Sequence, residues 1–419
     1  MTSGDMRDLA RTLFLAGVRA ADPGLAVKRA LGADALGAAP QGCVILIAFG
    51  KAACAMMEEA LRHVPKGQDF TAVAVTNYEN AREIDGCKVF ASGHPLPDQN
   101  GIDAGIEVMR ILDAATQNDK VLCLISGGGS ALLPTPREGI SLAEKIRVNE
   151  LLLSGGLDIG QMNTVRQQLS VLKGGGLAAM AHPATVRSLI ISDVVGDDIG
   201  TIASGPTAAA SDNSATIALL KSRDIWANLP ASARTLLAAP RTFTPRDADN
   251  AIICSNLQSL REIARSAPDW SPQIMSDPLV GDVEDAAREI VGHARSIPNA
   301  APQLLIWGGE TTVALKGTGR GGRNQELAVR VASLAGDLPG DWVFLSGGTD
   351  GRDGPTDAAG GIVTPRTLER AQAENINVKS ALNDNDSYRI LDAAGALLTT
   401  GPTGTNVADI QLFFRMPEP

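Results

Sequence analysis

The feature that most constrains this chain is a repeated order of a short apolar run, a Gly-rich or acidic loop, and a stretch with helical periodicity. Stretches of the helical kind include 52–64 and 324–334. Uninterrupted apolar runs of this length indicate strands buried on both faces, and repeated β-loop-α units indicate a parallel sheet covered by helices. We therefore predict a doubly wound α/β architecture. The runs interpreted as buried parallel strands are 43–49, 72–76, 121–125, 188–192, 251–254, 304–307 and 343–345.

The length of the chain predicts two domains. A chain of 419 residues exceeds what one hydrophobic core usually organises. Strand-like sequence becomes sparse between about 211 and 249, where Pro230, Pro240 and Pro245 interrupt polar and Ala-rich segments. We expect one domain over residues 1–240 and a second over 241–419, with a cleft between them.

Composition excludes several classes of partner. With 37 Lys and Arg against 47 Asp and Glu, the net charge of −10 disfavours binding to nucleic acid or anionic membranes. Secretory-signal features are missing at the start, and no apolar run approaches the roughly 20 residues that span a bilayer. Five scattered cysteines without a C-x-x-C pair fit reduced thiols, and four isolated histidines make a zinc site unfavourable. We expect a soluble cytoplasmic protein with no nucleic-acid or membrane partner.

Glycine clusters mark where a ligand is expected. Several of the clusters directly follow a predicted strand, where ligands of open α/β sheets bind and where glycine lets the backbone approach them. Together they predict an extended site for a polyanion, although the P-loop pattern G-x-x-x-x-G-K-[ST] is absent. The clusters are 126–130, 173–176, 308–310, 317–322, 346–351 and 401–406.

Two of the predicted strands end beside groups suited to anions. The serines and three glycines of 126–130 follow one strand, and their backbone N–H groups could form an anion nest. A tight turn that needs glycine for packing is the alternative. Lys51 follows another strand at the start of a helix, where its ammonium group could neutralise a phosphate or carboxylate. A solvated surface lysine is the alternative there, mildly disfavoured by the helix dipole.

Acidic loops supply candidate metal ligands or a base. Asp193, Asp197 and Asp198 directly follow the run 188–192 and suit Mg²⁺ or a general base for a substrate hydroxyl. The alternative is a polar loop whose carboxylates cap backbone N–H groups. The loop containing Asp353 has the spacing of a cation-binding loop without the EF-hand pattern, with Asx turns as its alternative.

The segment 317–322 contains G-x-G-x-x-G, so a dinucleotide site has to be weighed. Arg320 and Arg323 lie in or next to it and would form a cationic collar at a helix start. Guanidinium groups suit a transferring phosphoryl group better than a hydride, so we favour a phosphate site.

Read in order, the segments FGKAA, GHPLPDQNG, LISGGGSALL, NTVRQQLSVLKGGGLA, ISDVVGDDIGTIASGPT, GGETTV, GRGGRNQELA, SGGTDGRDGPTDAAGG and GPTGTNVADI make the chain resemble the class II glycerate kinases. The resemblance implies a Rossmann-like N-terminal domain, a C-terminal α/β domain with a MOFRL region over about 302–415, and an active site in the interdomain cleft. It also implies conversion of D-glycerate to 2-phosphoglycerate with ATP and Mg²⁺. Family members carry proposed active-site residues that correspond to Lys51 and Arg323.

These interpretations together assign roles to residues. We predict Lys51, Asp193 and Arg323 as catalytic and expect Ala at position 51 or 323 to stop turnover with the fold intact. The predicted Mg²⁺ ligands are Asp193, Asp197 and Asp353. The predicted nucleotide or phosphate-binding residues are Ser126, Gly127, Gly128, Gly129, Ser130, Lys173, Glu310, Gly319, Gly321, Gly322 and Asn324.

Two other functions stay open at this point. Some family members are labelled hydroxypyruvate reductase, which would use 317–322 as an NAD(P)H site. A non-catalytic sensor of phosphorylated sugars is the other alternative. A homodimer is considered as the oligomeric state.

Overall fold

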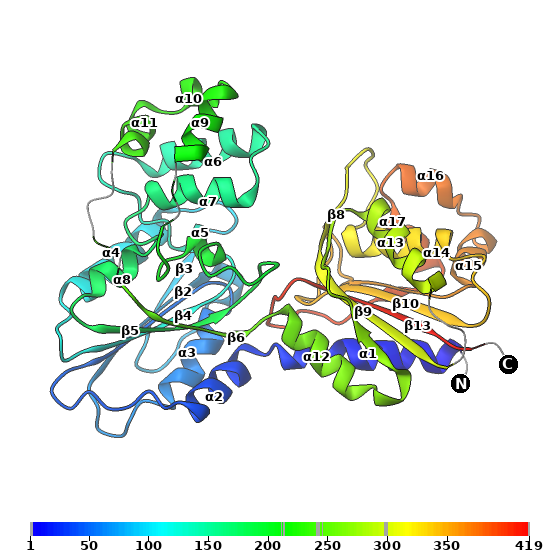
Figure 1. The fold of residues 1–419 in the computed structure, drawn as a ribbon, viewed down its shortest axis with the longest axis horizontal. Helices are drawn as coiled ribbons and strands as arrows, with labels where there is room; N and C mark the ends of the chain where they lie inside the picture. Colours follow the sequence, from blue (N-terminus) through cyan, green and yellow to red (C-terminus); the bar gives the residue numbers. More distant parts are fainter. Residues whose placement is uncertain are drawn as a thin grey trace. The chain divides into compact units, whose positions relative to one another are not determined.

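The computed structural model describes residues 3–210, 212, 214–239, 244, 246–296 and 301–417. It divides the chain into two compact units, one formed by Pro23–Cys254 and the other by Met1–Asp22 together with Ser255–Pro419 (Figure 1). We call them the sheet-A unit and the MOFRL-side unit. The predicted two-domain α/β architecture is confirmed, and each unit is described by itself below.

The sheet-A unit is built on a six-stranded parallel sheet in the order β3-β2-β1-β4-β5-β6. This order is that of Rossmann folds, in which the direction of strand addition reverses between β1 and β4. The predicted Rossmann-like domain is therefore confirmed. The strands are β1 (Val44–Phe49), β2 (Phe70–Asn77), β3 (Lys88–Ser92), β4 (Lys120–Ile125), β5 (Thr185–Ile191) and β6 (Asp249–Cys254).

Helices cover both faces of this sheet. Helices α2 (Pro23–Ala33) and α3 (Ala53–Leu61) lie on one face, and α4 (Gln99–Asp113) and α8 (Gly176–Ala181) lie on the other (Figure 1). Strand β1 is consequently buried at every position, which explains its uninterrupted apolar sequence.

A group of helices, here called the helical cap, has a small core of its own. It consists of α6 (Leu142–Ser154), α7 (Ile159–Gln168), α9 (Ser214–Ser222), α10 (Ile225–Asn228) and α11 (Ala231–Ala238). Side chains such as Leu152, Leu220 and Leu237 form its core. Helices α6 and α7 each begin with a capping box, which fixes where they start. The cap accounts for the low strand content of 211–249.

The MOFRL-side unit has a seven-stranded sheet in the order β12-β11-β10-β13-β9-β7, with β8 paired to β9. Helices α1 (Ser3–Ala20) and α12 (Asn256–Ser266) lie on one face, and α13 (Val283–Ser296), α14 (Arg323–Leu334) and α17 (Ser387–Ala393) on the other (Figure 1). The remaining elements are β7 (Pro272–Ile274), β8 (Leu279–Asp282), β9 (Gln303–Thr312), β10 (Trp342–Gly348), β11 (Gly360–Val363), α15 (Thr367–Ala373), α16 (Val378–Asn383), β12 (Leu397–Leu398) and β13 (Asp409–Arg415).

The prediction of parallel strands is wrong for part of this second sheet. Strand β10 pairs antiparallel with β11 and β13, and β9 also pairs antiparallel with β13. Helices cover both faces here too, so an antiparallel strand acquires the same continuous apolar sequence as a parallel one. A continuous apolar run therefore indicates that a strand is buried on both faces, and it does not indicate the direction of the strand.

The predicted first domain, residues 1–240, differs from the sheet-A unit, Pro23–Cys254, at its start and at its end. Helix α1 buries Met6, Leu13 and Phe14 in a core shared with β9, β10 and β13, so the start of the chain belongs to the MOFRL-side unit. Strand β6 pairs with β5 and therefore extends the sheet-A unit to Cys254. The predicted boundary at 240–241 itself lies outside the described residues. The predicted cleft between the domains stays a prediction.

Cys54, Cys123 and Cys254 are buried, and no disulfide bond is formed among the described residues. In the part of the chain that the structure describes, no helix is long and apolar enough to cross a membrane.

Candidate active site

Three of the predicted site segments lie at the carboxyl ends of adjacent parallel strands. Lys51 follows β1, the loop 126–130 follows β4, and Asp193 follows β5. Strand β4 pairs in parallel with both β1 and β5, so the three loops emerge at one edge of the sheet. This edge includes the β1/β4 position, where the order of strands reverses and where Rossmann-type folds bind ligands.

The first two loops are joined by backbone contacts. The N–H of Lys51 donates to the carbonyl of Gly127 at 2.9 Å, and the N–H of Ala52 donates to Ser126 Oγ at 3.1 Å. Gly50 has a φ of +124°, and a Cβ atom there would lie 2.2 Å from Ser126 Oγ. Glycine is required at this position because both the backbone angle and the close approach exclude a side chain. The contacts fix the backbone of Lys51 against the Gly-rich loop.

The glycines of that loop also make room for functional side chains. A Cβ atom on Gly127 would lie 2.0 Å from Asp193 Oδ2. Gly128 has a φ of +81°, and its Cβ would lie 3.1 Å from the His94 ring and 3.3 Å from Lys51 Cγ. The structure therefore brings Lys51, Asp193 and the Gly-rich loop together, as the sequence predicted, and adds His94. We call Lys51, His94, Asp193 and the loop 126–130 the strand-end cluster.

The electrostatics of the strand-end cluster suit proton transfer. Loss of solvent raises the pKa of the Asp193 carboxyl above its ordinary value, against the opposing effects of its own backbone hydrogen bond and of Lys51. Burial, and then Lys51, lowers the pKa of His94 to about 4, so its ring is neutral near pH 7. Lys51 forms no ion pair with any described residue, so no described carboxylate neutralises its charge by direct contact.

The other two carboxylates of the loop after β5 differ from each other. Asp198 accepts from the N–H of Gly200 at 3.1 Å and from Thr201 Oγ1 at 2.6 Å, so it stabilises its own loop as the structural alternative predicted. Asp197 is half-buried and has a φ of 55°. Of the two carboxylates, Asp197 is therefore the better candidate for binding a ligand or metal ion.

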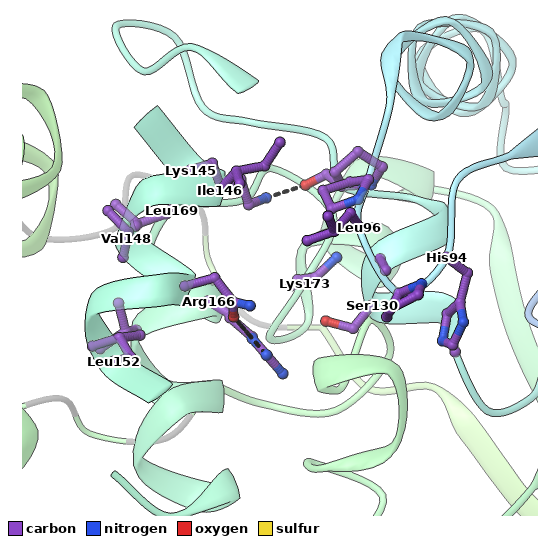
Figure 2. A pocket seen from close by; sticks show the side chains of 17 residues that line it. His94, Leu96, Ser130, Lys145, Ile146, Val148, Leu152, Arg166, Leu169 and Lys173 are labelled. Atoms are coloured by element: carbon purple, nitrogen blue, oxygen red, sulfur yellow. Dashed lines mark hydrogen bonds between the residues drawn. The ribbon is translucent and has the colours of Figure 1, made fainter. Parts of the chain in front are cut away.

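A cavity of about 270 Å³ lies beside the strand-end cluster and shares His94, Gly128 and Ser130 with it (Figure 2). Three cationic side chains reach it. Lys173 is 2% exposed and donates to the Leu133 carbonyl at 2.9 Å, Lys145 donates to the Pro134 carbonyl, and Arg166 donates to Asn149 Oδ1 at 2.6 Å. No Asp or Glu is among the described residues that line it. We call it the cationic pocket.

In the MOFRL-side unit, Arg323 forms a charged cluster at the first position of α14. Its Nε donates to Asp409 Oδ2 at 2.6 Å, its Nη2 donates to Asp409 Oδ1 at 3.0 Å, and its Nη1 lies 3.0 Å from Glu310 Oε1. Burial alone would lower the pKa of Arg323, but pairing with Asp409 and Glu310 holds it above the ordinary value. Asp409 is fully buried, whereas the Arg323 side chain is 34% exposed. The exposed part of this side chain is what a ligand could contact.

The predicted phosphate-binding role of the 317–322 loop is not supported by its contacts. The N–H groups of Lys316 and Gly317 donate to Asn385 Oδ1 at 2.6 and 3.1 Å, and Gly319 donates to the Asp384 carbonyl at 2.9 Å. A Cβ atom on Gly321 would lie 2.1 Å from Ser387 Oγ. The glycines are explained by close packing on 384–387, so they need no bound phosphate.

The start of α14 is likewise already filled by a carboxylate. Asp353 accepts from the N–H groups of Asn324 at 3.1 Å and Gln325 at 2.8 Å, and a Cβ atom on Gly322 would lie 2.3 Å from it. The Asn324 side chain is buried and accepts from Ser346 Oγ at 2.6 Å. Burial raises the pKa of Asp353 to about 6. These contacts favour a structural role for Asp353 and Asn324 over the predicted metal and nucleotide roles.

No group of three or more His, Cys, Asp or Glu side chains placed to hold a metal ion occurs among the described residues. Mg²⁺ usually takes only one or two protein carboxylates and completes its shell with water and phosphate oxygens. Asp193 and Asp197 can meet that requirement, because they lie in one loop beside the Gly-rich loop.

Comparisons with known proteins agree with this geometry. Residues 9–238 match a family described as Domain of unknown function (DUF4147), and residues 303–409 match the MOFRL family. The chain is 39% identical to the glycerate 2-kinase of Pyrococcus horikoshii, over 98% of this chain and 97% of that protein. The chain belongs to the glycerate kinase family. It resembles the crystal structure of glycerate kinase from Thermotoga maritima with a TM-score of 0.89 and 36% identity, covering 99% of this chain and 100% of that one.

The family also includes proteins with a different label. A relative from Agrobacterium vitis, named putative hydroxypyruvate reductase, is 38% identical over 98% of this chain and 95% of that protein. Names alone therefore do not separate the two activities in the glycerate kinase family, and the contacts of the site have to decide.

Sequence reasoning missed part of the site in this glycerate kinase family member. Lys145 lies in a segment that has only the signature of an amphipathic helix, so no local signal marks it. Arg166 lies within the recognised segment NTVRQQLSVLKGGGLA but was given no role. His94 lies in the Pro-rich segment GHPLPDQNG, whose local pattern favours a structural turn over a ligand contact. Lys145, Arg166 and His94 come together only when the helical cap folds over the edge of the sheet, so no local pattern identifies them.

Proposed function

We propose that this chain transfers the γ-phosphoryl group of ATP to the 2-hydroxyl of D-glycerate, giving 2-phosphoglycerate and ADP. The observation that carries the proposal is the strand-end cluster at the ligand-binding edge of a Rossmann-type sheet. In it, a lysine that forms no ion pair with a described residue lies with a carboxylate of raised pKa and a Gly-rich backbone. The names of the relatives from Pyrococcus horikoshii and Thermotoga maritima supply the substrate.

In the proposed reaction the glycerate hydroxyl oxygen bonds to the γ-phosphorus while the bond from that phosphorus to the bridging oxygen breaks and ADP leaves. Asp193 accepts the hydroxyl proton, which its raised pKa favours. Lys51 faces the charge on the transferring group, and backbone N–H groups of 126–130 with Lys173 bind nucleotide phosphates. Asp197, together with Asp193 if that residue acts as a ligand and not as the base, would hold Mg²⁺, which when bound neutralises phosphate charge.

We also propose that Arg323 takes part in the reaction, with Glu310 and Asp409 holding its guanidinium in place. Arginine held by two carboxylates keeps its charge and its orientation, which suits recognition of a carboxylate or phosphate. Gly319, Gly321, Gly322, Asn324 and Asp353 are left out of the proposal, because their contacts within the MOFRL-side unit account for them.

Contacts in the 317–322 loop argue against a hydroxypyruvate reductase. A dinucleotide site of the G-x-G-x-x-G kind places the pyrophosphate at the N-terminus of the following helix. Here the carboxylate of Asp353 occupies that helix start and would repel a pyrophosphate.

The discriminating assay supplies D-glycerate, ATP and Mg²⁺ and couples the product to enolase, with and without phosphoglycerate mutase.

Product without the mutase is expected and identifies a 2-kinase. Product only with the mutase would move the phosphorylated position to the 3-hydroxyl. No product, together with NADH oxidation by hydroxypyruvate, would contradict the kinase proposal. Ligand binding without any turnover would instead identify a sensor.

Asp193→Asn should lower kcat by about 10²-fold or more, because an amide neither accepts the proton nor binds Mg²⁺ strongly. Steady-state kinetics over a range of Mg²⁺ concentrations checks this. Recovery of activity at high Mg²⁺ would indicate that the residue acts as a metal ligand, and no recovery would indicate a base. Asp198→Asn is the matched control in the same loop, and activity near wild type is expected for it. Equal losses in the two variants would contradict the assignment.

A further inference from the structure

The cationic pocket contains more positive charge than a small acceptor needs. Glycerate carries one negative charge, whereas Lys145, Arg166 and Lys173 all reach the same cavity. Figure 2 shows the nitrogen atoms of these side chains directed toward one space beside the Ser130 hydroxyl. In the described part of the chain, neither Lys145 nor Arg166 forms an ion pair, and no carboxylate lines the pocket. Such an arrangement is suited to a ligand with several negative charges.

Most of the remaining pocket wall is apolar, which a polyhydroxy acid does not require. Val148, Leu152 and Leu169 lie on the helical-cap side, and Leu96, which is 60% exposed, lies near the opposite wall (Figure 2). Apolar walls of this kind bind flat, weakly polar groups such as a nucleobase. The pocket thus combines an apolar compartment with a polyanion compartment, and only one of the two proposed substrates has both features.

Contacts within the sheet-A unit hold Lys145 and Arg166 in position, and in the described part of the chain these contacts are made with neutral groups. Lys145 and Lys173 donate to the adjacent backbone carbonyls of Pro134 and Leu133, and Arg166 donates to the amide oxygen of Asn149. Neutral acceptors orient a donor and leave its charge available to a ligand. His94, Gly128 and Ser130 connect this pocket to the strand-end cluster.

We infer that the cationic pocket is the nucleoside triphosphate site, with Lys145 and Arg166 binding the phosphates and the apolar wall of α6 and α7 receiving the base. The chain of phosphates then leads past Ser130 and Gly128 toward Lys51 and Asp193. This inference rests on the proposed kinase function for the direction of transfer. The choice of a nucleotide over glycerate rests on the pocket alone.

A titration should accompany binding at this pocket. Burial, and then Arg166, lowers the pKa of Lys145 to about 7. Arg166 is the charged group that faces it from the pocket wall. The other titratable groups there are His94 and Lys173, and burial, followed by Lys145 and Arg166, holds the pKa of Lys173 well below its ordinary value. Bound phosphates favour the protonated amine of Lys145 and raise its pKa. Below pH 7 the amine is already charged, so the affinity ratio of wild type to Lys145→Gln is at its maximum. Above pH 7 this ratio should fall by up to tenfold per pH unit, as measured by calorimetry between pH 6 and 9. A ratio that does not change with pH would contradict phosphate contact by Lys145.

The deciding experiment titrates the Mg²⁺ complex of AMP-PNP, a non-hydrolysable ATP analogue, into wild type, Lys145→Gln, Arg166→Gln and the matched control Arg147→Gln. Arg147 lies on the same helix but is exposed, so its variant should bind within about threefold of wild type. The Kd should rise tenfold or more for the other two variants. Unchanged Kd values in both would overturn the inference.

Kinetics and a second site of mutation keep the two proposals separate. Lys145→Gln should leave the KM for D-glycerate within about threefold, and a raised glycerate KM with an unchanged AMP-PNP Kd would make this the acceptor site. If either buried substitution unfolds the protein, Leu96→Asp at the exposed edge should still weaken AMP-PNP tenfold by charge repulsion, and no weakening would overturn the inference. Nucleotide binding without phosphorylation of any glycerate would defeat the kinase proposal and retain this pocket.

Discussion

Replacing Lys51 by Met should lower kcat/KM by about 10²–10³-fold, because one charge that faces the transferring phosphoryl group or the substrate carboxylate is lost. Lys51 forms no ion pair with a described residue, and the contacts that fix its position use its backbone, through Gly127 and Asn80. The thermal unfolding midpoint should therefore stay close to that of wild type. Steady-state kinetics and a thermal melt of the same preparation check both parts.

Lys66→Met provides the matched control for this loss of charge. Lys66 is exposed in the turn after α3, so the variant has the same change of net charge away from the strand-end cluster. Its kcat/KM should lie within about twofold of wild type. Activity of Lys51→Met within about threefold of wild type would remove Lys51 from the reaction.

Replacing Arg323 by Met should abolish turnover and also destabilise the protein by about 3–5 kcal/mol, because Asp409 is then left as a buried carboxylate without its partner. The buried ion pair with Asp409 argues against the expectation, drawn from sequence, that the fold would survive loss of Arg323 unchanged. The free energy of unfolding from chemical denaturation measures the loss. Arg288→Met, which removes an exposed arginine from α13, is the control and should cost less than about 1 kcal/mol.

The double variant Arg323→Met, Asp409→Asn separates the structural from the chemical role of the arginine. Removing both charges takes away the penalty of a buried unpaired carboxylate, so most of the lost stability should return. Activity should not return, since the guanidinium is still absent. Recovery of turnover together with stability would show that Arg323 acts only through the fold.

The strand-end cluster could be predicted from sequence because its parts follow local rules. A buried strand, a glycine-rich turn and a helix start recur around Lys51 and 126–130, and parallel strands bring their carboxyl ends to one edge. Sequence could not show that the N–H groups of 317–320 are satisfied by 384–386, because those partners lie more than 60 residues along the chain. A glycine required for close packing and a glycine required for a ligand have the same sequence signature.

The domain division shows the same limit. Amphipathic periodicity predicts a helix near the start of the chain, but nothing in that pattern identifies the sheet on which its apolar face packs. Helix α1 joins the MOFRL-side unit through Met6 and Phe14, although most of the chain lies between it and its partners.

Local sequence patterns predict the doubly wound α/β class and the segments at the strand ends, because burial, turn chemistry and strand ends are properties of neighbouring residues. The Rossmann-like first domain followed from the family resemblance. Long-range contacts set the direction of strands in the second sheet, the placement of Asp353 at the start of α14 and the formation of the cationic pocket, so these features appear only in the folded chain. That pocket depends on α6, α7 and two loops meeting in space, and long-range packing of this kind leaves no periodic signal in any one segment.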